Sequence, residues 1–139
     1  MADLVRKFHR AGGQRLEAGE VLYSEHGRVV DGLYLCGYCV ECSLKAMVLT
    51  RIPIQRQRDY VTTEFRGKVA HNFDSLVDQL IKLGGSPIPR TILRGLRTGR
   101  LIWNSELRYE TGLGNLKDED IQDFLTFARR FWVWVKEII

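Results

Sequence analysis

The stretch LYLCGYCVECSLKAMVL, residues 33–49, decides the fold. It is apolar on nearly every side of a helix, and its only charged residues are one glutamate and one lysine. A helix without a broad polar face is buried by neighbouring helices on several sides. The sequence therefore predicts a central helix over residues 29–49, inside an all-α, antiparallel bundle of four to five helices.

A membrane-spanning helix is a different interpretation of this stretch. Such a helix needs about 20 predominantly apolar residues. Asp31 at the start of the run, and Glu41 and Lys45 near its end, leave too short an uninterrupted apolar segment. The sequence does not favour a membrane span.

The C-x-x-C-x-x-C spacing of Cys36, Cys39 and Cys42 resembles that of a metal site. On a helix, however, the three side chains span about 120° and would not converge on one ion. A tetrahedral site would also need a fourth ligand from one of the three histidines. Free cysteine commonly behaves as a small buried hydrophobe. We therefore expect core cysteines, no metal and no cofactor.

Glu41 and Lys45 lie one helical turn apart, so their side chains can pair. A carboxylate on a helix this apolar needs a partner, because an unpaired buried charge is neutralised or destabilises the fold. Lys45 is the local candidate. Arg108 is a distant one, which would lock the fourth helix onto the second.

The bulk composition is that of an ordinary soluble globular protein. The chain has 139 residues, 45% hydrophobic and 27% charged, which suggests one domain over residues 1–139. No charged n-region followed by an apolar h-region is present, so no signal peptide is predicted. The odd number of cysteines argues against a disulfide framework. A cytoplasmic protein is expected.

Periodicity and breaks divide the rest of the chain. Residues 3–26 are predicted to be helical, as one helix or as two that separate at Gly12-Gly13. Residues 50–70 lack a clear period and are predicted to be a connection with one short helix at its end. Asn72 can cap the next helix, which has Phe73, Leu76, Val77, Leu80 and Leu83 on one face. A fourth helix is expected from about Arg90 to Leu107, and a last one from near Asp118.

The last helix carries a wide apolar arc. Its predicted core stripe is Ile121, Phe124, Leu125, Ala128, Phe131, Trp132, Val135 and Ile139. Phe127 and Trp134 fall off the centre of that stripe and widen the arc towards half of the helix. A small monomer needs less, so these two residues are predicted to pack on a second copy in a homodimer. The alternative is that segment 50–70 covers them.

Positive charge is concentrated in the middle of the chain. Residues 51–100 contain ten basic and four acidic residues, whereas the flanking parts are balanced or slightly acidic. Arg90, Arg94 and Arg97 fall on one helix face, with Arg100 nearby. Such a face can follow the phosphates of RNA or of a nucleotide. The alternative is a solvated helix face.

Four segments, in order, resemble the HEPN family. The run Tyr34–Ala46 is similar to the family's second helix, with an aromatic residue, small residues and then Glu-x-x-Leu-Lys-Ala. The segment His71–Leu76 resembles the His-x-Leu-x-x-Leu start of the third helix, and Trp103–Glu110 resembles an Arg-Tyr-Pro-Asp/Glu element. The run Ala128–Lys136 is similar to the end of the closing helix. The resemblance covers about residues 3 to 136.

This resemblance implies a helical bundle that pairs into a homodimer. HEPN proteins include metal-independent ribonucleases, RNA- or nucleotide-binding modules, and partners of minimal nucleotidyltransferases in toxin–antitoxin and defence operons. We expect this chain to bind RNA or a nucleotide and to be one half of such a pair. The alternatives are a metal-independent ribonuclease and a scaffold that binds only protein.

Catalytic HEPN members use an arginine followed four to six residues later by a histidine. Here Arg108 has no histidine within that reach, and the spacing occurs only from Arg66 to His71, before the third helix. Arg66 would stabilise charge on the scissile phosphate and His71 would act as general base or acid. The alternative is a local structural role for His71 and a solubility role for Arg66. Arg108 and Tyr109 are candidate phosphate ligands, or Arg108 is the partner of Glu41.

Overall fold

The chain folds into helices and short connections. The computed structural model describes residues 3–139, apart from the side chains of Asp3 and Arg108. These residues form six α-helices, two 3-10 helices and no strand, which confirms the all-α bundle with more helices than the four to five expected. In chain order they are α1 (Asp3–Ser24), α2 (Val29–Thr50), α3 (Ile54–Glu64), η1 (Gly67–His71), α4 (Phe73–Lys82), α5 (Arg90–Gly99), η2 (Ser105–Tyr109) and α6 (Asp118–Ile138).

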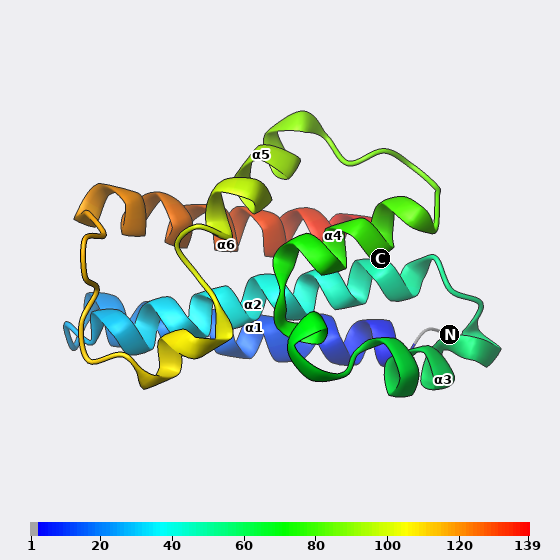
Figure 1. Cartoon of the computed structure of the whole chain (residues 1–139), viewed down its shortest axis with the longest axis horizontal. Coiled ribbons are helices and arrows are strands. Elements are labelled where there is room, and N and C mark those ends of the chain that lie inside the picture. The colour runs from blue at the N-terminus through cyan, green and yellow to red at the C-terminus, as the bar shows by residue number, and fades with distance from the viewer. Residues whose placement is uncertain (1–2) are drawn as a thin grey trace.

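Helix α2 lies at the centre of the bundle, as its apolar sequence predicted. The long helices α1, α2 and α6 follow the length of the molecule, and their colours show that α1 runs opposite to α2 and α6 (Figure 1). Helix α2 packs against α1, α6 and α4. By length and composition alone α2 could cross a membrane, but 83% of its apolar 18-residue segment is buried inside the bundle. Its apolar surface is therefore already covered by protein.

Glycines bring the backbones of α1 and α2 into direct contact. A Cβ atom at Gly19 would lie 2.8 Å from the carbonyl oxygen of Gly32, and one at Gly12 would lie 3.2 Å from that of Cys39. Side chains at these positions would push the helices apart, because protein interiors have little free space. Gly12 therefore serves the packing of α1 against α2, while Gly13 leaves space for the ring of Trp132 on α6. Helix α1 continues through both glycines as one helix, and the alternative of two helices is wrong.

The three cysteines of α2 lie inside the protein. Cys36, Cys39 and Cys42 are free thiols that are at most 4% exposed, which confirms them as core residues. Burial raises the pKa of Cys36 and of Cys42 to about 12, and it also raises the pKa of Cys39. Because the thiolate is the reactive form, we expect these side chains to react slowly with thiol reagents at neutral pH.

The segment between α2 and α4 is more helical than predicted. The short helix expected at its end corresponds to η1, but α3, which begins directly after Pro53, was missed. Buried Gln57 fixes α3 in place, since its Nε2 donates to the carbonyl oxygens of Leu49 at 2.9 Å and Ile52 at 3.1 Å. These bonds join α3 to the last turn of α2 and to the connection that follows it.

Helix α5 is shorter than predicted and ends at Gly99 instead of about Leu107. The chain leaves the helix so that Trp103 packs against α2, where its indole Nε1 donates to the carbonyl oxygen of Tyr34 at 2.9 Å. Trp103 is only 2% exposed. Burial of so large an aromatic side chain outweighs the helical hydrogen bonds that are given up.

Two glycines let α5 approach α6 closely. A Cβ atom at Gly95 would lie 2.2 Å from the ring of Phe127, and one at Gly99 would lie 2.8 Å from the ring of Phe124. Helix periodicity alone gives no reason for glycine at these positions, and the contacts supply one. Phe127 is thus partly covered by α5, and its predicted role in a homodimer stays a prediction.

The ends of two helices differ in detail from the sequence pattern. Asn72 caps α4 as predicted, because its side chain accepts a hydrogen bond from the backbone nitrogen of Ser75 at 3.1 Å. Leu83 and Ile139, both expected in the core, are 36% and 38% exposed. Each directly follows the last residue of its helix, where the apolar face no longer meets a neighbour.

Candidate functional site

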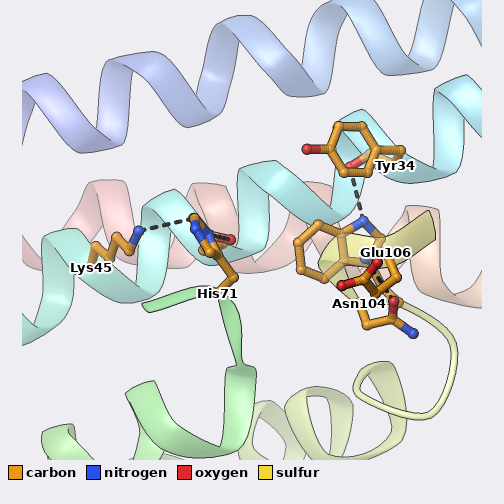
Figure 2. Close-up of polar contacts among 7 residues, drawn as sticks. Tyr34, Lys45, His71, Asn104 and Glu106 are labelled. Atoms are coloured by element: carbon orange, nitrogen blue, oxygen red, sulfur yellow. Dashed lines mark hydrogen bonds and ion pairs between the residues drawn. The ribbon is translucent and has the colours of Figure 1, made fainter. Parts of the chain in front are cut away.

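A buried carboxylate on α2 joins two basic side chains. Glu41 is 1% exposed, and its Oε2 accepts a hydrogen bond from Nζ of Lys45 at 2.9 Å. Its Oε1 lies 3.0 Å from Nδ1 of His71. Figure 2 shows Lys45 on α2 and His71 at the end of η1 reaching the same place. The Glu41–Lys45 pair is confirmed, and His71 is a second partner that the sequence did not indicate.

The structure fixes both the position and the tautomer of His71. It is the last residue of η1, and Asn72 directly after it is the extended cap of α4. A carboxylate only accepts hydrogen bonds, so Nδ1 of the neutral ring carries the proton and donates it to Glu41. Nε2 then has a free lone pair in the neutral form. Because the side chain is 42% exposed, the rest of the ring is accessible.

His71 lines an open pocket of about 260 Å³. The pocket is formed by η1, the start of α4, and the connection from α5 into η2. Its lining residues are Lys68, His71, Asn72, Phe73, Asp74, Arg100, Trp103, Asn104, Ser105 and Glu106. Sites for drug-sized ligands measure roughly 300–1,000 Å³. A phosphate with its sugar therefore suits this pocket better than a large cofactor.

Aromatic rings form the rigid base of the pocket. Phe73 and Trp103 are each 2% exposed, and their rings stack with centroids 5.0 Å apart. The indole fits because α2 has a glycine beneath it: a Cβ atom at Gly37 would lie 2.1 Å from Trp103. The hydrogen bond from Trp103 to Tyr34 (Figure 2) holds the indole in place. The buried rings stabilise the pocket but offer no open face on which a base could stack.

The basic face predicted for α5 is partly neutralised. Asp74 lies 2.6 Å from Nη1 of Arg97 and 3.1 Å from Nε of Arg100. Lys68 adds a further positive charge at the pocket and Glu106 a negative one. Three basic side chains therefore face two acidic ones, and the pocket region keeps only a small positive excess.

The other predicted site residues lie elsewhere. Arg66 is exposed directly before η1 and does not occur among the described residues that line the pocket. Arg90 is exposed at the start of α5, and Arg94 lines a different cavity, between α5 and α6. Tyr109 is 69% exposed at the end of η2. The side chain of Arg108 lies outside the described residues, so its ion pair and phosphate contact stay predictions.

Lys68 and Asp74 are among the pocket residues that the sequence did not predict. Lys68 lies three residues before His71, and a 3-10 helix has three residues per turn, so both fall on one side of η1. That spacing would have indicated Lys68 once the segment was assigned as a 3-10 helix. Asp74 lies in the first turn of α4. No sequence signal shows that it meets Arg97 of α5 and Arg100 directly after α5.

In the part of the chain that the structure describes, no three His, Cys, Asp or Glu side chains gather in a way that could hold a metal ion. No protein-family model, no curated protein and no solved structure matches the chain. The function of the site is therefore inferred from the positions and charges of its side chains.

Proposed function

We propose that this chain is a cytoplasmic HEPN-type protein that binds RNA at the pocket around His71. The observation that supports this most is the anchored imidazole: buried Glu41 holds one edge of the ring, while the other edge is accessible beside Lys68 and Arg100. Two cations and a ring nitrogen in one concave surface suit a phosphate group. The motif resemblance to HEPN proteins favours the same ligand class.

The geometry favours a strand held by its backbone over a free nucleotide held by its base. The pocket has no open aromatic face for a base, because Phe73 and Trp103 are buried. Its small positive excess predicts few phosphate contacts. With two contacts, the slope of log affinity against log salt for a single strand would be about −1.4.

Fluorescence anisotropy with a labelled single-stranded RNA tests this binding mode. Lys68→Gln and Arg100→Gln should each weaken binding and reduce the salt slope by about 0.7. Asp74→Asn should strengthen binding, because it frees Arg97 and Arg100 from their carboxylate. Lys82→Gln, at the far end of α4 and exposed, is the matched control and should change little.

Two outcomes would count against the RNA site. Equal affinities for the Lys68→Gln, Arg100→Gln and Lys82→Gln variants would show that the pocket does not hold the strand. Complete displacement of RNA by a mononucleotide at comparable concentration would reassign the ligand to a nucleotide.

A metal-independent ribonuclease is the second candidate, and the Glu41–His71 contact favours it. In this reaction a base removes the 2′-OH proton, the 2′-oxygen bonds to phosphorus, and the P–O5′ bond breaks as the 5′-oxygen takes a proton from water. Nε2 of His71 would accept the 2′-OH proton, while Glu41 fixes the tautomer and stabilises the imidazolium. Lys68 and Arg100 would offset the charge that develops on the phosphate.

An RNA cleavage assay in EDTA distinguishes this pocket from the sequence-based pair. If His71 acts with Lys68, His71→Ala should reduce cleavage by about 100-fold or more, and Lys68→Ala should reduce it much more than Arg66→Ala. If Arg66→Ala loses cleavage and Lys68→Ala does not, the catalytic pair is Arg66 and His71 as predicted from the sequence. If the unaltered protein leaves the RNA intact, it is not a ribonuclease, and RNA binding is the function that remains.

We further propose that the protein forms a homodimer and pairs with a minimal nucleotidyltransferase in a toxin–antitoxin or defence system. Apolar side chains near the end of α6 support the dimer: Val133 is 39% and Ile138 is 48% exposed, beside half-buried Trp134. Sedimentation equilibrium should find a dimer that Ile138→Asp converts to a monomer. A monomeric unaltered protein would contradict the homodimer.

A further inference from the structure

A second concave surface, of about 380 Å³, lies between α1 and α3 over α2. Figure 1 shows α3 beside the N-terminal half of α1. None of its lining residues belongs to the His71 pocket. They are the apolar residues Leu4, Phe8, Ala11, Tyr38, Cys42 and Val61 and the polar residues Lys7, Arg15, Arg58 and Thr62. We refer to this surface as the α1–α3 groove.

The groove follows one face of α1. Its α1 residues run from Leu4 to Arg15, a rise of about 16 Å along the helix axis. The small side chain of Ala11 leaves space in the middle of this face. Phe8 is held at one side by the ring of Phe65, with centroids 5.9 Å apart and planes nearly perpendicular. The apolar floor is therefore preformed, as in most small-molecule sites.

The charges around this floor are unbalanced. Lys7, Arg15 and Arg58 line the groove, and none of the described residues that line it is acidic. Cζ of Arg15 lies 5.9 Å from the centroid of the Tyr38 ring, so this cation lies over an aromatic wall of the groove. The nearby Glu41 does not compensate it, because that carboxylate is buried and bonded to other side chains.

The cavity between α5 and α6 provides a contrast. It has a similar apolar floor, but Arg94 at its edge is accompanied by Asp120 and Asp123. Of these two surfaces, only the α1–α3 groove has basic lining residues without an acidic one. A neutral apolar ligand would contact the apolar floor of the groove but would not pair with its three cations. A bare inorganic anion would pair with the cations but would leave the apolar floor exposed to water.

We propose that the α1–α3 groove binds a small amphiphilic anion, with its apolar or flat aromatic body on the floor and its anionic group beside Arg15, within the positive field of Lys7, Arg15 and Arg58. A fatty-acid carboxylate and a nucleoside monophosphate both have this chemistry. The site goes beyond RNA binding at the His71 pocket and does not depend on it, because the two surfaces share no lining residue.

A matched pair of fluorescent probes tests the groove. 1-Anilinonaphthalene-8-sulfonate carries an aromatic body and an anion, and N-phenyl-1-naphthylamine is the same body without the sulfonate. The sulfonate should bind the unaltered protein at least about tenfold more tightly than the neutral probe, as expected for one charge-assisted contact. The double variant Arg15→Gln/Arg58→Gln should lose this preference. Arg90→Gln/Arg94→Gln removes the same charge from α5, outside the groove, and should keep it.

A second variant fills the groove instead of changing its charge. Ala11→Phe places a ring in the space above the floor and should abolish sulfonate binding, with folding checked by circular dichroism. Displacement of the sulfonate by dodecanoate would identify a lipid-type ligand, and displacement by adenosine monophosphate a nucleotide-type one. Equal binding of the two probes, an unaffected Arg15→Gln/Arg58→Gln variant, or displacement by neither compound would refute the site. RNA binding by the same variants, measured in parallel, keeps this result separate from that of the His71 pocket.

Discussion

Removal of the Glu41 charge should destabilise the fold strongly. Glu41→Gln keeps the shape of the side chain but leaves the Lys45 ammonium without its carboxylate, and the Lys45 side chain is only 9% exposed. The ring of Phe65, with its centroid 5.4 Å from Nζ, cannot replace that charge. Breaking one partner of a buried ion pair costs about 3–5 kcal/mol. With an m-value of about 2 kcal/mol/M, a loss of 4 kcal/mol lowers the urea midpoint by about 2 M.

Two further variants make this measurement decisive. Glu41→Leu/Lys45→Met removes both charges and should recover most of the lost stability, since apolar residues of similar volume commonly replace buried pairs without loss. Asp31→Asn breaks the exposed Arg28–Asp31 pair and should cost less than about 0.5 kcal/mol. A cost below about 1 kcal/mol for Glu41→Gln, or a double variant no more stable than Glu41→Gln, would contradict a buried pair of this kind.

Three other measurements follow from the same structure. Gly37→Ala should destabilise the protein by about 2 kcal/mol or more in a urea titration, because the added Cβ would lie 2.1 Å from Trp103. This overpacking outweighs the gain in helix propensity. Gly112→Ala is the control and should change little, since a Cβ there would have no neighbouring atom within 4 Å. Burial lowers the pKa of His9 below 6.5, so the unfolded chain binds the proton more readily than the folded one. The free energy of unfolding should therefore fall as the pH drops from about 6.5 towards the folded-state pKa. His9→Gln should flatten this pH dependence, and an unchanged slope in that variant would show that His9 does not cause it. Because burial raises the pKa of all three cysteines, a thiol reagent at neutral pH should label them slowly in the native protein and promptly in denaturant. Fast labelling of the native protein would show that the cysteines of α2 are accessible to solvent.

The elements that the sequence predicted well are those whose signal is local. The apolar run of α2 indicated a central helix, and Asn72 marked the start of α4 by a cap that acts within three residues. The elements predicted wrongly depend on distant partners. α5 ends early because Trp103 packs against α2, and α3 is fixed by bonds from Gln57 to the end of α2. Neither contact leaves a pattern within its own segment.

The site shows the same division between local and distant signals. The Glu41–Lys45 pair follows from a spacing of one helical turn. The contact from His71 to Glu41 joins residues thirty positions apart and required the path of α3 and η1. The basic face of α5 was visible as a repeat of arginines, but its partial neutralisation by Asp74 was not, because that carboxylate comes from another helix.

The position of Glu41 is better explained by the site than by the stability of the fold. A buried ion pair rarely stabilises a protein more than apolar residues of the same volume would. Where α2 meets α1, small or apolar side chains such as those of Gly32 and Cys36 make the contact. What an apolar pair could not do is hold Nδ1 of a 42% exposed histidine at 3.0 Å and so fix its tautomer. The variant Glu41→Leu/Lys45→Met separates these roles: it should remain folded and yet lose the RNA cleavage proposed for His71.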